Sequence, residues 1–134
     1  MKHKSERTKR IEKLDDLWSR VVRTRDGFHC QKEGCNGHGK YMHAAHINTR
    51  NNKKLRWNIR NGITLCYHHH IVWGHSEPNE FDKWIKDKIG DDLYNELNEI
   101  SKIRPKPIDD KFLDNIEKLL KSQLSEYENR VEPF

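Results

Sequence analysis

The chain has little apolar material from which to build a core. Only 33% of its 134 residues are hydrophobic, while 35% are charged. No apolar run approaches the roughly 20 residues that a membrane-spanning helix requires, so we expect no membrane segment and no membrane partner. A small domain with so thin a core often relies on a metal ion or on disulfide bonds.

Cysteine is also scarce. The three cysteines cannot all pair with one another, and segment 1–13 is polar and basic, unlike a secretory signal peptide. In a reducing compartment, metal binding is the usual structural use of cysteine. The sequence therefore predicts a cytoplasmic protein, in the host cytoplasm if a phage encodes it, whose cysteines bind metal.

Acidic residues are few in the first part of the chain. Residues 1–76 hold 16 Lys and Arg against 6 Asp and Glu, a net of +10, whereas residues 77–134 hold 10 against 15, a net of −5. A basic body beside an acidic tail is typical of a polyanion-binding domain. Many proteins are basic, but here the positive charge coincides with the candidate site described below, so we expect a polyanion as the partner.

Helical periodicity marks both ends of the chain. Apolar residues recur at three- and four-residue steps from about Ser5 to Arg25 and predict an amphipathic helix. Three further helices are predicted in the second half: 79–89 behind Pro78, 91–103, and 109–127. Because a proline-rich linker precedes the last helix, we divide the chain into a domain over 1–103 and an extension over 104–134. That last helix either packs on its own domain or forms a homodimer interface.

The middle of the chain predicts a ββα unit. A short strand is expected over 40–48 and a second over 62–65, followed by a helix or tight turn over 66–75. The loop 48–61 is rich in basic residues, and Trp57 within it is equally open as a core residue or as a base-stacking residue. Five side chains of this loop are expected to bind DNA phosphates: Arg50, Lys53, Lys54, Arg56 and Arg60.

Two pairs of candidate metal ligands flank the predicted hairpin. Cys30 and Cys35 precede it, and Cys66-x2-His69 follows its second strand. Three thiolates and one imidazole suit tetrahedral Zn²⁺, and such a closed site contributes folding energy directly. His68 is an alternative fourth ligand, but the two-residue spacer favours His69. The competing interpretation is that the cysteines are core residues beside a solvent-facing histidine cluster.

A second group of polar residues suits phosphodiester hydrolysis, which needs a general base, a cation and a means of holding both. His46, at the end of the first strand, is placed to be the base, since a neutral imidazole works near pH 7. Asn61 would fix the basic loop and thereby orient His46. A catalytic divalent cation, with Zn²⁺ and Ni²⁺ among the possible ions, would be bound by three histidines: His43, His70 and His75.

His75 is the least regular of these proposed ligands. It follows His70 by five residues, and on an ideal α-helix two such residues lie about 140° apart. Either the turn there is distorted or another group takes the place of His75.

These residues resemble a known family. Ala45-His46-Ile47, Asn61 and His70, with the Cys66-x2-His69 knuckle, are similar to the motif of HNH (ββα-metal) endonucleases. Three further pieces resemble the phage recombination endonucleases of the NinG/Rap type: 14–18 (LDDLW), 56–57 (RW) and 78–81 (PNEF). The resemblance implies a ββα-metal fold and Mg²⁺- or Mn²⁺-dependent DNA cleavage, acting on branched DNA in the recombination branch.

Two positions depart from the family pattern. Ala45 stands where many members have an Asp or His metal ligand, and His69 stands where the second knuckle usually has Cys. We therefore expect an α+β fold: a small zinc-stabilised ββα-metal (HNH) domain with an N-terminal helix and a helical C-terminal extension. Its expected function is a metal-dependent DNA endonuclease, with His46, Asn61 and His70 in the catalytic motif. The alternatives are a catalytically degenerate HNH-like zinc module that binds DNA, which Ala45 favours, and an interaction protein that uses its acidic helical tail.

Overall fold

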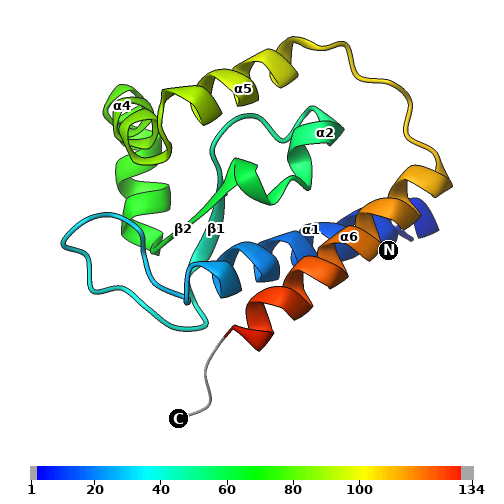
Figure 1. Ribbon diagram of the computed structural model, residues 1–134, viewed down its shortest axis with the longest axis horizontal. Helices are drawn as coiled ribbons and strands as arrows, with labels where there is room; N and C mark the ends of the chain where they lie inside the picture. The colour runs from blue at the N-terminus through cyan, green and yellow to red at the C-terminus, as the bar shows by residue number, and fades with distance from the viewer. Residues whose placement is uncertain (1–2, 131–134) are drawn as a thin grey trace.

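The protein has an α+β fold in which helices surround one two-stranded antiparallel hairpin, as Figure 1 shows. The structure is a computed structural model and describes residues 3–130. Its elements, in chain order, are α1 (Glu6–Arg25), β1 (His43–His46), α2 (Lys53–Arg56), the 3₁₀-helix η1 (Ile59–Asn61), β2 (Gly62–Leu65), the π-helix η2 (His68–Trp73), α3 (Gly74–Ser76), α4 (Pro78–Ile89), α5 (Asp91–Lys102) and α6 (Asp110–Asn129).

The hairpin is shorter than its sequence pattern predicted. β1 pairs with β2 from His43 opposite Leu65 to His46 opposite Gly62. The expectation of a strand over 40–48 was too long, because the backbone N–H of Met42 donates to the carbonyl of Gly39 (3.2 Å) in a turn and so is not available to a partner strand. The basic loop that joins the strands is also partly helical, since it contains α2 and η1.

Helix α1 packs directly on the hairpin. Ser5 caps its N-terminus by accepting from the backbone N–H of Thr8 (3.1 Å), and four apolar side chains on one face are buried: Leu14, Trp18, Val21 and Val22. The close approach depends on Gly62, because a Cβ there would lie 2.6 Å from Cζ2 of Trp18. The absence of a side chain at this one position therefore sets how near α1 comes to β2.

Helix α6 lies alongside α1 (Figure 1) and shares its core. Leu113 and Leu120 are fully buried in the same cluster as Leu14 and Trp57. Around this seam, basic residues of α1 pair with acidic residues of α6: Arg7 with Asp110, Arg10 with Asp114, Lys13 with Glu117, and Arg20 with Glu128. Segment 104–130 thus packs with the rest of the chain through α6.

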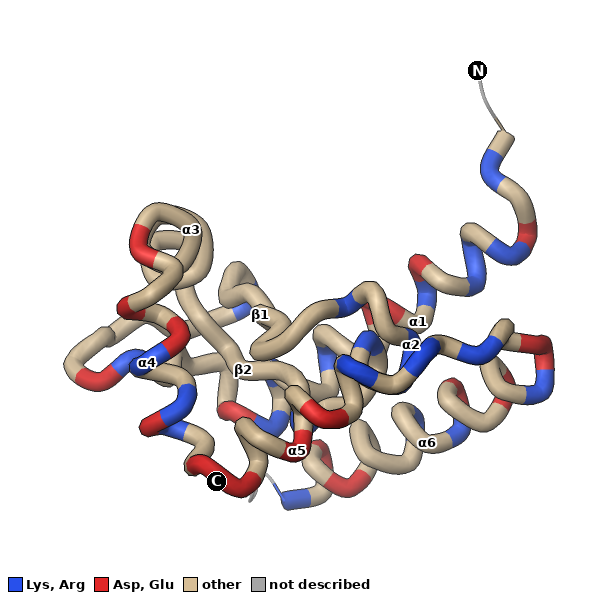
Figure 2. Tube along the Cα trace, turned by 90° about the horizontal axis from the view of Figure 1, so that it is seen from above, with Lys and Arg blue, Asp and Glu red and all other residues tan. Residues whose placement is uncertain are grey.

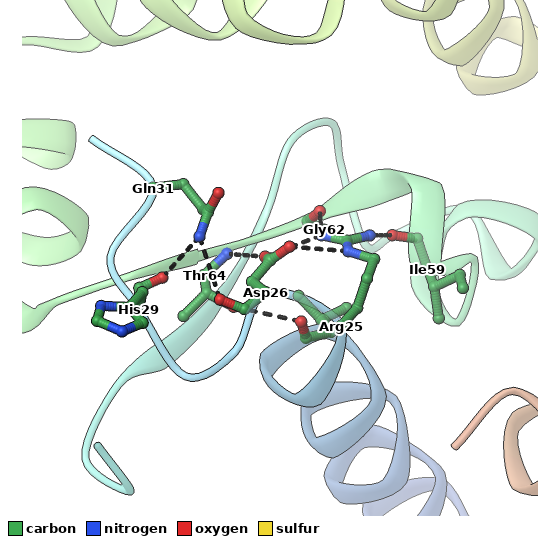
Figure 3. A network of polar contacts seen from close by, with 8 residues as sticks. Arg25, Asp26, His29, Gln31, Ile59, Gly62 and Thr64 are labelled. Atoms are coloured by element: carbon green, nitrogen blue, oxygen red, sulfur yellow. Dashed lines mark hydrogen bonds and ion pairs between the residues drawn. The ribbon is translucent and has the colours of Figure 1, made fainter. Parts of the chain in front are cut away.

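The C-terminal end of α1 is fixed to β2 by the polar network in Figure 3. The guanidinium of Arg25 donates to the carbonyls of Ile59 (2.7 Å) and Gly62 (2.8 Å) and is paired with the neighbouring carboxylate of Asp26. Asp26 in turn accepts from the backbone N–H of Thr64 (2.9 Å). Gly62 and Thr64 of β2 are therefore bonded to Arg25, the last residue of α1, and to Asp26, which follows it.

A second, smaller core lies on the other side of the hairpin. Ala45, Ile63 and Leu65 pack there with Cys30 and with Ile85 of α4. Trp57, which the sequence left open, belongs to the first core and is 1% exposed. Among the described residues no helix is long and apolar enough to cross a membrane.

Candidate functional site

The four predicted zinc ligands lie together beside the hairpin. One ligand atom from each of Cys30, Cys35, Cys66 and His69 can be chosen so that all four lie within 4.8 Å of one another. Sγ of Cys35 lies 3.9 Å from Sγ of Cys66, and Nδ1 of His69 lies 3.6 Å from Sγ of Cys30 and 3.2 Å from Sγ of Cys66. With zinc–sulfur bonds of about 2.3 Å, tetrahedral ligands lie about 3.5 to 3.8 Å apart. The group could therefore hold a metal ion such as zinc.

Two backbone N–H groups point at sulfur atoms of this group. The N–H of Gly37 donates to Sγ of Cys35 (3.4 Å), and the N–H of His69 donates to Sγ of Cys66 (3.4 Å). Glycine at position 37 keeps this site uncrowded, because a Cβ there would make a tight contact of 3.1 Å with Cβ of Cys66. N–H groups that point at sulfur favour the charged thiolate, which is the form that binds metal.

The thiols differ in how easily they lose a proton. Burial raises the pKa of Cys30 to about 11, whereas the N–H of Gly37 lowers the pKa of Cys35. A bound cation would have to displace the Cys30 proton, so metal affinity at this group should rise with pH.

His46 is held on two sides. Its ring stacks on the indole of Trp18, with centroids 4.0 Å apart and an angle of 7° between the planes. Its Nε2 lies 2.9 Å from the carbonyl oxygen of Arg56. A carbonyl can only accept, so Nε2 carries the hydrogen and Nδ1 of the neutral ring keeps its lone pair. Burial lowers the pKa of His46 below its ordinary 6.5, which keeps the ring neutral near pH 7.

Asn61 is fully buried and ties the basic loop together. Its Oδ1 accepts from the N–H of Asn48 (2.7 Å), and its Nδ2 donates to the carbonyl of Leu55 (3.1 Å). Leu55 precedes the residue whose carbonyl binds His46. The geometry thus agrees with the interpretation that Asn61 fixes the loop and, through it, His46.

The three remaining histidines of the motif also meet. Nδ1 of His43 lies 3.0 Å from Nδ1 of His70, and the ring of His75 lies 5.7 Å from that of His70 between centroids. The five-residue spacing left open a distorted turn or another ligand, and the turn is distorted: it is the π-helix η2, whose hydrogen bonds join residues five apart, as from Gly74 to His69. Burial, followed by the neighbouring His43 and His75, lowers the pKa of His70 to about 4.

His46, His70 and His75 border a cleft of about 530 Å³, and His43 contacts it through His70. Its lining comes from α1, β1, the basic loop and the turn after β2: Asp15, Trp18, Ser19, Ala44, His46, Arg50, His70 and His75. Ala45, where the family pattern has a ligand, is 1% exposed and packs in the second core. A side chain at that position faces away from this cleft, and Ala44 lines it instead.

The five basic residues predicted to bind DNA are not equivalent. Arg50 lines the cleft and is exposed. Arg56 is bound by Asp15 through two hydrogen bonds (2.8 and 2.6 Å), which occupy its guanidinium. Arg60 makes a similar two-point pair with Glu96 at the surface.

The two lysines of α2 border a different pocket, of about 250 Å³, formed with the linker to α6. In Figure 2 basic positions gather on α2, and acidic positions recur along α5 and α6. Of the five predicted phosphate ligands, Arg50 is therefore the one that reaches the histidine cleft.

Two residues of the site were missed as functional. Trp18 was assigned to the core, and it is buried, but its ring also supports His46. Asp15 holds both Arg56 and Nε1 of Trp57 (2.9 Å). Both belong to the stretch Leu14-Asp-Asp-Leu-Trp18. The resemblance of this stretch to the NinG/Rap-type motif could have indicated that these two residues contribute to the site.

Comparison with protein-family models, with curated proteins and with solved structures finds no significant match to this chain.

Proposed function

We propose that this protein is a metal-dependent DNA endonuclease of the HNH (ββα-metal) type. The observation that carries the proposal is the state of His46: Nε2 is bonded to the Arg56 carbonyl, and the ring lines a cleft shared with two further histidines and Arg50. A neutral imidazole with one fixed N–H and one free lone pair is the form that a general base requires. The resemblance of the motif to HNH enzymes supports the same assignment.

In the proposed reaction, Nδ1 of His46 takes a proton from a water molecule as its oxygen attacks phosphorus. The bond from phosphorus to the 3′-oxygen breaks and this oxygen takes a proton from solvent water, which leaves a 3′-hydroxyl and a 5′-phosphate. A divalent cation would stabilise the charge that develops on the phosphate and on the leaving oxygen. The Arg56 carbonyl keeps the imidazole from rotating, and Trp18 covers one of its faces.

The residues that would hold the cation are His43, His70 and His75. Three imidazoles suit Zn²⁺ or Ni²⁺ better than Mg²⁺, which prefers oxygen ligands. Asp15, the one carboxylate among the residues that line the cleft, is already bound to Arg56. We therefore propose that a transition-metal ion supports cleavage better than Mg²⁺ does.

Arg50 is the proposed phosphate ligand of the cleft. Its side chain can bind two oxygens of one phosphate at once. Lys53, Lys54 and Arg60 would then contact the DNA backbone outside the cleft, where they position the strand.

The second candidate is an HNH-like zinc module that binds DNA without cutting it. The burial of position 45 in the core favours it, because the family's usual ligand next to the base cannot reach the cleft here. The Cys3His group would still fold the hairpin in such a protein.

A cleavage assay separates the two candidates. Wild type and His46→Ala are incubated with supercoiled plasmid and with a synthetic four-way junction, under Mg²⁺, Mn²⁺, Zn²⁺ or Ni²⁺. The proposal expects cation-dependent cutting that the variant lacks, and the better substrate identifies the branch of the family. Equal DNA binding by both proteins with no cutting under any cation would establish the non-catalytic module instead.

A further inference from the structure

Two tyrosines are exposed at one end of the hairpin. The side chain of Tyr41 is 79% exposed and that of Tyr67 is 61% exposed, the two highest values among the large apolar residues that the structure describes. Tyr41 precedes β1 and Tyr67 follows β2, so both flank the end where His43 pairs with Leu65. Covering a solvent-exposed aromatic ring with a flat apolar partner lowers the free energy.

This end of the hairpin is continuous with the histidine cluster. The ring of Tyr67 meets that of His43 edge-on, with centroids 6.1 Å apart and an angle of 88° between the planes. His43 is in turn 3.0 Å from His70, which lines the cleft. A ligand that covers Tyr67 could therefore extend along His43 and His70 into the cleft.

The chain segment that contains both tyrosines carries positive charge and no carboxylate. From Gly34 to Ser76 the chain has six Lys and Arg, seven His and no Asp or Glu. Nζ of Lys40 lies 5.2 Å from the centre of the Tyr41 ring, and the carbonyl of Lys40 is fixed by Arg23 (3.2 Å). A cation beside an exposed aromatic face matches a nucleotide, which has a phosphate next to a flat base.

We propose that Tyr41 and Tyr67 stack on the bases of an unpaired DNA strand that leads into the cleft. In a duplex the faces of the bases are covered by their neighbours, so exposed tyrosines could only touch the backbone. In a single strand every base has a free face, and stacking on it is tolerant of sequence. The choice of DNA rests on the proposed function; the stacking itself does not.

The test is binding of a fluorescein-labelled oligothymidylate of about 12 nucleotides, compared with a duplex of the same length. Fluorescence anisotropy is read without added divalent cation, so that binding is measured without cleavage. The proteins are wild type, the double variant Tyr41→Ala/Tyr67→Ala, and the double variant Tyr41→Phe/Tyr67→Phe, which keeps the rings. Leu119→Ala serves as the control, since Leu119 is also exposed (51%) but lies on α6.

We expect the alanine double variant to weaken single-strand binding by roughly ten- to hundredfold, with duplex binding unchanged. The phenylalanine variant and Leu119→Ala should bind both probes as wild type does. The inference is overturned if the alanine variant binds the single strand as tightly as wild type, or loses single strand and duplex to the same degree.

The two proposals can fail separately. If the protein cleaves plasmid and the alanine variant binds single strands as wild type does, the nuclease proposal holds and the stacking proposal fails. Loss of single-strand binding in a protein that cuts no DNA would leave the stacking site on a module that only binds.

Discussion

The imidazole of His46 lies flat against the indole of Trp18, with the two rings 4.0 Å apart between centroids. Trp18 is itself fixed, because its Nε1 donates to the carbonyl of Asn58 (2.9 Å). One helix thus supplies a wall for the proposed base, and the loop between the strands supplies its hydrogen-bond acceptor. This arrangement explains why burial is the main cause of the lowered pKa of His46.

Replacing Trp18 should change the titration of His46. In Trp18→Leu the stacked ring is lost and water reaches the imidazole, so its pKa should rise toward the ordinary 6.5. Trp18→Phe keeps an aromatic face and should leave the pKa lowered. The pKa of His46 is read from its ring proton shifts by NMR. An unchanged pKa in Trp18→Leu would mean that the stack does not govern the environment of His46.

A side chain at Gly62 should disturb the same stack from below. The Cβ of Gly62→Ala would lie 2.6 Å from Cζ2 of Trp18 and 2.8 Å from Cγ2 of Val22. We expect a loss of about 1–3 kcal/mol in the free energy of unfolding, measured with urea, together with reduced cleavage.

Gly34→Ala is the control for that variant, because a Cβ at Gly34 meets no atom within 4 Å. Its φ of +79° makes alanine strained there, so stability should fall while cleavage by the folded protein stays at the wild-type rate. Equal loss of cleavage in both variants would contradict a specific role for the Gly62 contact.

The metal group predicts different outcomes for neighbouring histidines. Purified wild type should contain about one zinc per chain, and His69→Ala should lose it. His69→Cys should retain zinc, because a thiolate replaces the imidazole, and His68→Ala should retain it because His68 is exposed and outside the group. Metal content is measured by mass spectrometry of the native proteins. Wild-type protein that binds no zinc would refute the site.

Asp15 should make stability depend on pH. Burial by itself would raise its pKa, but hydrogen bonds from Arg56 and Trp57 outweigh that effect and lower it. A group whose pKa is lowered by folding stabilises the protein above its unfolded pKa of about 3.9 and loses that contribution as pH falls through the folded pKa. Asp15→Asn should therefore be less stable than wild type near neutral pH, and the difference should shrink below about pH 4.

Urea unfolding across that pH range checks the prediction. Asp16→Asn is the matched control, since Asp16 is the exposed neighbour on the same helix, and it should not change the pH dependence. A difference between wild type and Asp15→Asn that stays constant with pH would show that the Asp15 carboxylate is not the cause.

Local patterns in the sequence predicted the parts of the fold that depend on local contacts. The periodicity of α1, the start of α4 at Pro78 and the two ligand pairs, Cys30 with Cys35 and Cys66 with His69, are each encoded within short stretches. The pairing of α6 with α1 was open from the sequence, because ion pairs such as Lys13 with Glu117 join segments that are remote in the chain.

For the same reason, the composition of the basic loop did not predict which of its basic side chains pair with carboxylates. Arg56 and Arg60 look alike in the sequence, yet one is bound by Asp15 of α1 and the other by Glu96 of α5. The five-residue step from His70 to His75 predicted either a distorted turn or a different ligand, and the π-helix is a distorted turn. Which positively charged side chain reaches the cleft depends on these tertiary pairs.

The most direct test of the central claim is chemical rescue at His46. His46→Gly removes the imidazole and leaves a space against Trp18 into which free imidazole can enter. The account predicts that this variant loses single-turnover DNA cleavage by about a hundred- to ten-thousandfold, and that added imidazole restores a substantial part of it. Cleavage by His46→Gly at the wild-type rate would show that His46 is not the base and would contradict the account.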